Sequence, residues 1–369
     1  MRLETPIDLF DDWLSTPPAK RSEDPRFEVK QARPQDFERI YDCVDESFGV
    51  SRPRSVYEWR YRANPYGQAR VWYVSEVSTG RIVKTGAYFP WPIAYDGELL
   101  KGSLAGDFGT VPEWQRRGLS AVSRNVRRSH PWHGQIVSMS GPNAGSRAVI
   151  TKSGEENSIL GALLGGVAVL DGTPFLQRAG LPIWLSAPIG LFSGRASSLL
   201  RRVTTRPSGS LRLEPLARFS SDLDGVTLEA MRFPKYWCPH NSDWLNWRYL
   251  DHPVESYSGF VLLEKQSDRP IGYSVLRLDG EQATLSEFAV SPRHAASLLS
   301  HTLESAEAAG SAFVNFFGTP GWRHWGLFRR AGFIAYVTNN FMDATDWSNK
   351  AESEDLASWQ VTPGDRDYR

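Results

Sequence analysis

The sequence has little of what marks secreted, membrane-spanning or metal-binding proteins. It contains only two cysteines, Cys43 and Cys238, which are too few for a disulfide framework and favour a reducing compartment. Its seven histidines form no zinc-site spacing, so no metal is expected. The longest apolar run, Ile159 to Leu170, is too short to span a bilayer, and the N-terminus lacks a basic start followed by an apolar run. We therefore expect a cytoplasmic protein.

The sequence also lacks an excess of charge of either sign. Lys+Arg and Asp+Glu number 42 each, so the formal net charge is zero and no nucleic-acid partner is expected. A local basic stretch remains, formed by Arg116, Arg117, Arg124, Arg127 and Arg128. The 41% of hydrophobic residues is ordinary for a globular protein, and 369 residues are enough for two domains of typical size.

An internal repeat supports two domains. Tyr57-Glu58-Trp59-Arg60-Tyr61 is followed by a proline at position 65, and Leu245-Asn246-Trp247-Arg248-Tyr249 by a proline at position 253. Both the tryptophans and the prolines are 188 residues apart. The shared Trp-Arg-Tyr is more consistent with a scaffold element, in which the aromatics pack and the arginine is paired, than with a substrate-binding element.

Two further landmarks follow in the same order. The dipeptide Asp96-Gly97 corresponds to Asp279-Gly280 at an offset of 183, and each lies between stretches rich in β-forming residues, which is a hairpin pattern. Pro112 then corresponds to Pro292 at an offset of 180. We predict two copies of one α/β unit, each with a helix, antiparallel strands and a helix after the proline.

One segment of the first copy has the pattern of an anion-binding loop. A β-rich run ends at Val111-Pro112, and Gln115-Arg116-Arg117-Gly118-Leu119-Ser120 leads into a helical pattern. The first N–H groups of a helix have no intrahelical partner, and its dipole adds partial positive charge there. Gly118 allows the backbone to approach a phosphate, and the arginines supply counter-charge.

This segment resembles motif A of the GNAT superfamily of N-acetyltransferases, whose Q/R-x-x-G-x-G/A loop binds the pyrophosphate of acetyl-CoA. Gln115, Gly118 and Ser120 fall on its three defining positions, with serine in place of the usual glycine or alanine. The resemblance implies that the main chain of Phe108, Gly109 and Thr110 lines the pantetheine arm. It assigns the cofactor site to those three residues and to Gln115, Arg116, Arg117, Gly118, Leu119, Ser120 and Asn143.

Asn143 belongs to a second stretch, PNAGSRAVITKSG, that resembles GNAT motif B with its Asn, small residue and Gly. The family usually has a tyrosine seven residues after the Asn, which protonates the leaving thiolate. This sequence has Ile150 there. The proton then comes from water or from a tyrosine elsewhere, or the domain binds CoA without turnover.

The second copy keeps the end of motif B, Leu327 to Phe333, but its loop after Pro292 has no glycine, so it is not expected to bind CoA. Chains with one working copy of two resemble enhanced-intracellular-survival-type acetyltransferases and FemABX-type transferases. The implied fold is α/β, with tandem GNAT-like domains of mostly antiparallel sheet flanked by helices. We predict a GNAT domain at 27–202, a linker at 203–211, a second GNAT-like domain at 212–342 and a C-terminal tail at 343–369.

The resemblance implies catalytic roles for two residues. The N–H of Thr110 would polarise the thioester carbonyl as in an oxyanion hole. Asp107, at the start of the cofactor-binding strand, is the candidate base that deprotonates the amine, although it could instead cap a turn or pair with an arginine. Glu287 has a similar place in the second copy.

The first functional hypothesis is an acetyl-CoA-dependent N-acetyltransferase that acts on a small-molecule or protein amine, with the acceptor, acyl chain length and oligomeric state left open. The alternatives are a FemABX-like aminoacyl transferase and a non-catalytic acyl-CoA-binding module. Leu181 to Arg202 has apolar residues early and arginines late, so it could touch a membrane surface, but packing between the two domains is favoured. The polar tail is expected to be loosely held.

Overall fold

The computed structural model describes residues 7–10, 20–21, 24–128, 137–153, 157–186, 188–189, 208–231, 234–346 and 355–366. We call residues 20–178 the first half and 208–366 the second half. The predicted linker 203–211 lies outside the described residues as far as position 207.

The first half alternates strands and helices in the predicted order. Its elements are β1 (Lys20–Arg21), β2 (Phe27–Gln31), α1 (Phe37–Phe48), α2 (Arg54–Tyr61), β3 (Arg70–Glu76), β4 (Ile82–Pro90), β5 (Ile93–Tyr95), β6 (Glu98–Leu100), β7 (Gly102–Thr110), α3 (Leu119–Arg128), β8 (Val137–Ser140), α4 (Ala144–Ser153), β9 (Asn157–Val169) and α5 (Thr173–Arg178).

The second half repeats this order and adds a C-terminal segment. Its elements are β10 (Leu211–Leu216), α7 (Asp224–Met231), β11 (Tyr236–Trp237), α8 (Ser242–Leu245), the π-helix η5 (Asn246–Leu250), β12 (Tyr257–Glu264), β13 (Pro270–Asp279), β14 (Gln282–Val290), α9 (Pro292–Ala308), β15 (Phe313–Gly318), α10 (Trp325–Arg330), β16 (Ile334–Asp346), η6 (Leu356–Ser358), β17 (Trp359–Gln360) and η7 (Pro363–Asp365).

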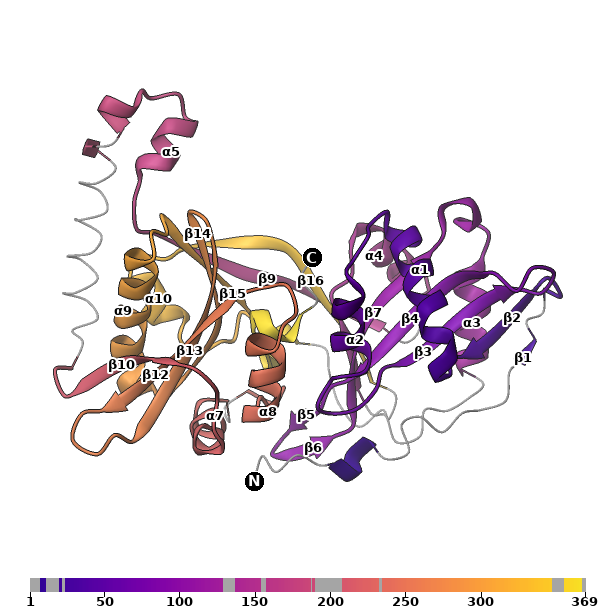
Figure 1. Ribbon diagram of the computed structural model, residues 1–369, viewed down its shortest axis with the longest axis horizontal. Helices are drawn as coiled ribbons and strands as arrows, with labels where there is room; N and C mark the ends of the chain where they lie inside the picture. The colour runs from indigo at the N-terminus through magenta and orange to yellow at the C-terminus, as the bar shows by residue number, and fades with distance from the viewer. Residues whose placement is uncertain are drawn as a thin grey trace.

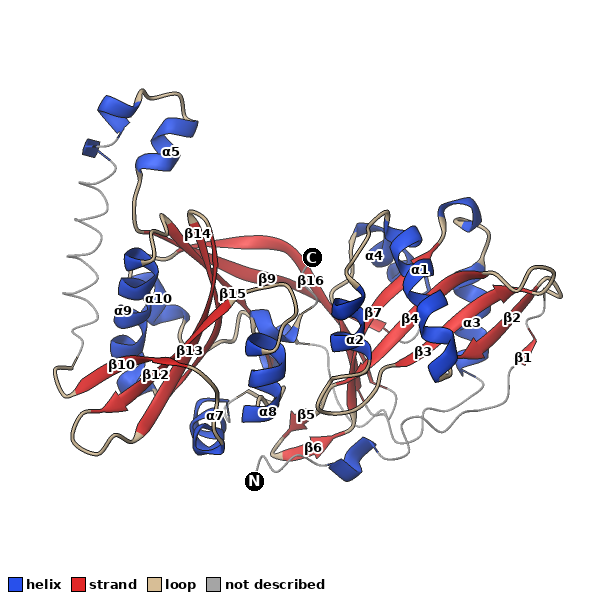
Figure 2. Cartoon of the chain, viewed as in Figure 1, coloured by secondary structure: helices blue, strands red, loops and turns tan. Residues whose placement is uncertain are grey.

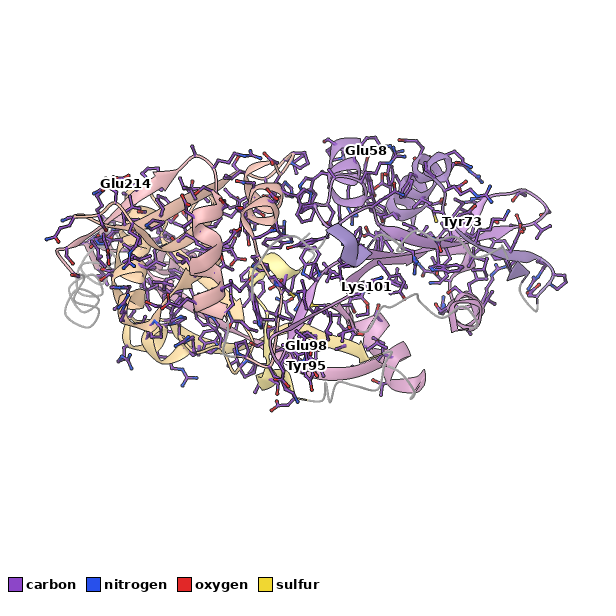
Figure 3. The ribbon with its side chains drawn as sticks, turned by 90° about the horizontal axis from the view of Figure 1, so that it is seen from below. Glu58, Tyr73, Tyr95, Glu98, Lys101 and Glu214 are labelled. Carbon is purple, nitrogen blue, oxygen red and sulfur yellow. The ribbon has the colours of Figure 1, made fainter. Side chains whose placement is uncertain are left out.

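The local patterns explain why these elements form. Along α1, Phe37, Ile40, Tyr41 and Val44 are buried at helical spacing, and Gly49 ends the helix with a φ of 63° that glycine adopts without strain. Both predicted hairpins are confirmed. Asp96 and Gly97 both have positive φ between β5 and β6, and Figure 3 shows the flanking Tyr95 and Glu98 close together.

In the second half, β13 ends at Asp279 and β14 begins at Gln282, so the two-residue turn is Gly280-Glu281. Only Gly280 has positive φ there. Asp279 therefore belongs to β13, and the turn begins one residue later than the Asp-Gly pattern predicts.

Most strands of both halves join in one mixed sheet, as Figure 2 shows, and β17, β11, β5 and β6 form a second, smaller sheet. Among the described residues the order in the mixed sheet is β1-β2-β3-β4-β7-β8-β16-β9-β15-β14-β13-β12-β10. Most neighbours are antiparallel, and the pairs β7·β8 and β14·β15 are parallel. The predicted α/β fold with a mostly antiparallel sheet is confirmed. In the first half α1 packs on β4 and β7, and in the second α9 packs on β13.

The two halves exchange strands at the centre of this sheet. The second-half strand β16 pairs through Asp343–Asp346 with β8 of the first half, and β9 pairs through Leu164–Val169 with β15 of the second half. Figure 1 shows β9 and β16 running together from one half to the other. The predicted division into domains at 27–202 and 212–342 remains a prediction. β9 lies within the first predicted domain, yet it is hydrogen-bonded to β15 and β16 of the second half.

Two expectations about the connecting and terminal segments are wrong. The described part of the 181–202 connector does not pack between the halves: Ile183 and Trp184 are 68% and 74% exposed, and Figure 1 shows α5, just before it, standing away from the body of the molecule. The tail is not loosely held where it is described, since Trp359 is fully buried and Asp365 almost so. No described helix has the length and apolarity needed to cross a bilayer.

Candidate active site

The predicted anion-binding loop joins β7 to α3. After β7 the short helix η3 (Pro112–Trp114) leads to an exposed turn, in which Arg116 and Gly118 have φ of 62° and 79°. α3 begins at Leu119, and the N–H groups of Ala121 and Val122 bond back to the Gly118 carbonyl. The loop therefore brings two exposed arginines next to the first turn of α3, where a helix carries N–H groups without intrahelical partners.

The edge of β7 beside this loop is open. β8 ends at Ser140, so it pairs with β7 only from Gly102 to Ala105, and no described strand pairs with this edge of β7 beyond that point. Val111 donates its N–H to the Val83 carbonyl on β4, so by strand alternation the N–H and C=O of Thr110 face the opposite, open edge. Gln115 Nε2 donates to the Thr110 carbonyl over 3.1 Å and ties the loop to the strand.

The remaining predicted cofactor residues lie along the same strand and loop. Phe108 is half-buried and packs edge-on against Tyr88, Gly109 is buried against Ser47, Leu119 is buried, and Ser120 is exposed. Asn143 lies directly before α4, where its side chain accepts the Ser146 N–H over 2.9 Å. Asn143 thus caps α4, while the structure brings β7, the loop and α3 together as the sequence predicts.

Asp107 lies at a bulge in β7 with a φ of 51°. Its carboxylate is completely buried and has three donors: Arg52 Nη1 at 3.2 Å, Arg60 Nη1 at 3.3 Å and the Tyr61 hydroxyl at 2.9 Å. Burial raises the pKa of this carboxyl, but Arg60 and Arg52 outweigh that effect and hold it below the usual range. The arrangement is the arginine pairing that the sequence left open beside the catalytic role.

The sequence analysis missed how the two Trp-Arg-Tyr elements meet. The indole rings of Trp59 and Trp247 stack with centroids 4.7 Å apart. Each ring nitrogen donates to the other residue's carbonyl, over 2.8 Å from Trp59 and 3.0 Å from Trp247. The contact has approximate two-fold symmetry, and the shared offset of 188 residues was the signal that could have predicted it. The packed indole rings and the pairing of Arg60 with Asp107 agree with the structural interpretation of these elements.

A cavity of about 270 Å³ adjoins this contact and is lined by both halves. The first half contributes the segment between α1 and α2, α2 itself, β4 and β7, and the second half contributes η5, the segment after it, β12 and β13. Arg60 lines the cavity and lies against Gly106, where a side chain would sit 2.7 Å from the Arg60 Nη2. The cavity therefore reaches β7 where that strand leaves β8.

The corresponding opening of the second half is filled by its own C-terminal segment. β14 and β15 pair only at Gln282–Thr284, and η7 packs against both strands beyond that point. Thr362 donates to Glu287 over 2.9 Å, and His240 bridges Glu287 and Asp365 at 3.1 and 2.8 Å. In the second half the described C-terminal segment therefore occupies the space between these strands.

A comparison with family models gives one match: the model described as an acetyltransferase (GNAT) domain fits residues 28–124. This segment runs from β2 into α3 and includes the loop and the open edge of β7. The chain carries a GNAT acetyltransferase domain. This domain is of the acyltransferase type, and the match ends before α4 and Asn143.

Solved structures place this GNAT domain within a tandem fold. A probable N-acyltransferase from Enterococcus faecalis V583 and a GCN5-related N-acetyltransferase from Anabaena variabilis align with TM-scores of 0.61 and 0.60 at 12% and 11% identity, each over 86% of this chain and 72% of theirs. A tandem GNAT protein from the clavulanic acid biosynthesis pathway aligns at 0.52 and 13% identity, over 87% of this chain and 98% of its own. The predicted tandem GNAT arrangement is confirmed.

None of the curated proteins compared with the chain matches it. The part of the chain that the structure describes also holds no group of three or more His, Cys, Asp or Glu side chains placed to bind a metal ion.

Proposed function

We propose that the first half transfers an acetyl group from acetyl-CoA to an amine, and that the second half binds no CoA. The observation that carries the proposal is the continuity of three features: the open edge of β7, the turn at Gly118 and the N-terminus of α3. The residues present fit a pyrophosphate, because nothing lies within 4 Å of a Cβ built at Gly118 and the neighbouring arginines are exposed.

The chain's own groups supply binding and electrostatics. The α3 N-terminus with Arg116 and Arg117 binds the phosphates, and the Thr110 N–H at the open edge stabilises negative charge that develops on the thioester oxygen. When bound, acetyl-CoA supplies a thioester whose carbonyl carbon bonds to the amine nitrogen while the C–S bond breaks, its electron pair leaving on sulfur and one amine proton being lost.

Asp107 has a different role in this proposal from that of a base. A carboxylate that accepts from three donors and has a lowered pKa is a poor proton acceptor. We assign it the positioning of Arg52 and Arg60 at the wall of the cavity. The aliphatic side chain of Ile150 cannot act as a general acid, so the leaving thiolate takes its proton from water or from another residue.

The test compares acetyl-CoA binding by calorimetry in the wild type, Gly118→Glu and Arg293→Glu. Gly118→Glu puts a side chain at a φ of 79° and a negative charge beside the phosphates, so affinity should fall at least about 100-fold. Arg293→Glu adds the same side chain to the exposed start of α9 in the second half and should change affinity less than about twofold.

The outcomes separate the three functional hypotheses. Binding at one site per chain that is lost only in Gly118→Glu, followed by turnover on amines, supports the proposal. Binding without turnover on any amine of a broad panel would assign a non-catalytic acyl-CoA module. A folded wild type that binds no acetyl-CoA would overturn the proposal in favour of aminoacyl transfer.

A further inference from the structure

The charge of the cavity between the halves is strongly one-sided. Its lining contains one carboxylate, that of Glu255, and five arginines, which come from both halves and from the C-terminal segment: Arg52, Arg60, Arg248, Arg277 and Arg366. Glu255 lies 3.6 Å from Arg277 and so offsets one of these charges. In a chain with equal numbers of acidic and basic residues, the excess of arginine in this lining is a local feature of the cavity.

Most of the positive charge is not offset by further carboxylates in the lining. Arg52 and Arg60 both contact the carboxylate of Asp107, which is not part of the lining. Arg248 donates from Nε to the Gly364 carbonyl at 3.0 Å and from Nη2 to the Arg366 carbonyl at 3.1 Å. Carbonyl groups satisfy hydrogen-bond donors but carry no net charge, so the guanidinium keeps its full positive charge at the wall.

The positive charge of the lining also affects His252, which lies in the same wall. Burial lowers its pKa first, and the nearby Arg248 and Arg277 lower it further, to about 4. Its Nδ1 accepts the Val254 and Glu255 N–H groups over 3.3 and 3.0 Å, so the proton of the neutral ring is on Nε2. His252 is thus a neutral hydrogen-bond donor among cations.

The rest of the lining is aromatic and apolar. Trp59, Phe89, Trp91, Trp247 and Tyr257 form the walls, with Leu104 of β7 at the side that meets the open edge. Flat aromatic walls favour an apolar or aromatic ligand body. A volume of about 270 Å³ suits a small molecule of about the size of an amino acid, rather than a folded protein surface.

Resting on the acetyl transfer proposed above, we propose that the acceptor is a small amine that also carries a carboxylate or a similar anionic group on an apolar or aromatic body. The arginines bind the anionic group, the tryptophan walls bind the body, and the amine faces the side where β7 leaves β8. Polycationic acceptors such as aminoglycosides are disfavoured, because their charges would meet five guanidinium groups.

The experiment measures acetyl transfer from acetyl-CoA to matched pairs of amines, phenylalanine with phenylalaninamide and tryptophan with tryptophanamide, and to neomycin. Each pair shares its amine and aromatic body and differs in the carboxylate. We expect kcat/KM to be at least about 10-fold higher for the acids than for the amides, and no turnover of neomycin. Calorimetry of the same acids without acetyl-CoA should show binding that weakens with salt.

Arg277→Gln tests the cavity directly, with Arg212→Gln as its control. Arg212 lies on β10, next to β12, and pairs with Glu214 and Asp268 outside the cavity. Arg277→Gln should reduce the acid-over-amide preference at least about fivefold, and Arg212→Gln should leave it unchanged. Equal turnover of acids and amides, preference for amides or neomycin, or no binding of the acids by a protein that binds acetyl-CoA would each overturn the inference. Failure to bind acetyl-CoA would instead overturn the proposed function.

Discussion

The two halves of this chain have the same scaffold, but the arginine of the Trp-Arg-Tyr element has different partners in each. In each half a tyrosine of the Trp-Arg-Tyr element donates to a buried carboxylate: Tyr61 to Asp107 on β7 over 2.9 Å, and Tyr249 to Glu287 on β14 over 2.8 Å. In the first half the adjacent Arg60 also bonds that carboxylate. In the second half Arg248 turns instead to carbonyls of the C-terminal segment.

That difference follows from the C-terminal segment. Gly364 lies so close to Tyr249 and Glu287 that any side chain there would overlap both, which leaves no room for Arg248 beside the carboxylate. His240 takes the place of the arginine as the cationic partner. Both copies thus keep the tyrosine–carboxylate hydrogen bond, while in the second copy the C-terminal segment fills the cleft and accepts the hydrogen bonds of the arginine.

The largest effect should come from His240, which holds the closed cleft of the second half. Burial lowers its pKa, but Asp365 and Glu287 outweigh this and raise it from 6.5 to about 10. The stabilisation is therefore complete below about pH 6.5 and is lost as the pH rises towards 10, at about 1.4 kcal/mol per pH unit and on the order of 5 kcal/mol in all.

Denaturant unfolding from pH 6 to 10 measures this loss, and His240→Gln supplies the comparison. The variant should be less stable at pH 6 and should lack the decline that is specific to the histidine. A wild type and variant with parallel stability profiles over this range would show that the closed cleft does not depend on a charged His240.

Asp107 should produce the next largest effect, on stability rather than on proton transfer. Asp107→Asn leaves Arg52 and Arg60 without their buried counter-charge, so the free energy of unfolding should fall by about 3 kcal/mol. Because the folded pKa is lowered, this stabilisation is present above about pH 4 and is lost below it.

The comparison variant is Asp45→Asn, which removes a less buried carboxylate that the Tyr57 hydroxyl and Arg54 contact in the same half. We expect it to cost about 1 kcal/mol. If Asp107→Asn kept wild-type stability while kcat fell about 100-fold and its pH profile lost a limb, Asp107 would be the base after all and the two halves would differ less than we argue.

Particular residues show how far the sequence reaches. The Asp-Gly turns, the prolines that end β7 and β14 and the loop at Gly118 are local features, and local features fix local backbone conformation. The exchange of β9 and β16 was not predictable in this way, because a strand's alternation of buried and exposed residues does not identify its partner strand.

The burial of the tail was missed for a related reason. Its composition is polar, but Thr362 and Asp365 are satisfied by Glu287 and His240, which lie 75 and 125 residues earlier in the chain. The partners of Asp107 were equally hidden: Arg60 belonged to the repeat, but nothing in the sequence connected Arg52 with a residue 55 positions further on.

The smallest effect should come from the symmetric contact itself, where the halves are most alike. Trp59→Phe and Trp247→Phe each remove one ring N–H and leave a carbonyl of the other half without its donor, so each should lower the unfolding free energy by about 1 kcal/mol. The two losses should agree within about 0.5 kcal/mol, and the double variant should show a coupling of about 0.5–1.5 kcal/mol because the rings stack. Unequal losses would show that the contact serves one half more than the other. Additive losses would show that the two hydrogen bonds form independently and that the stacking contributes little.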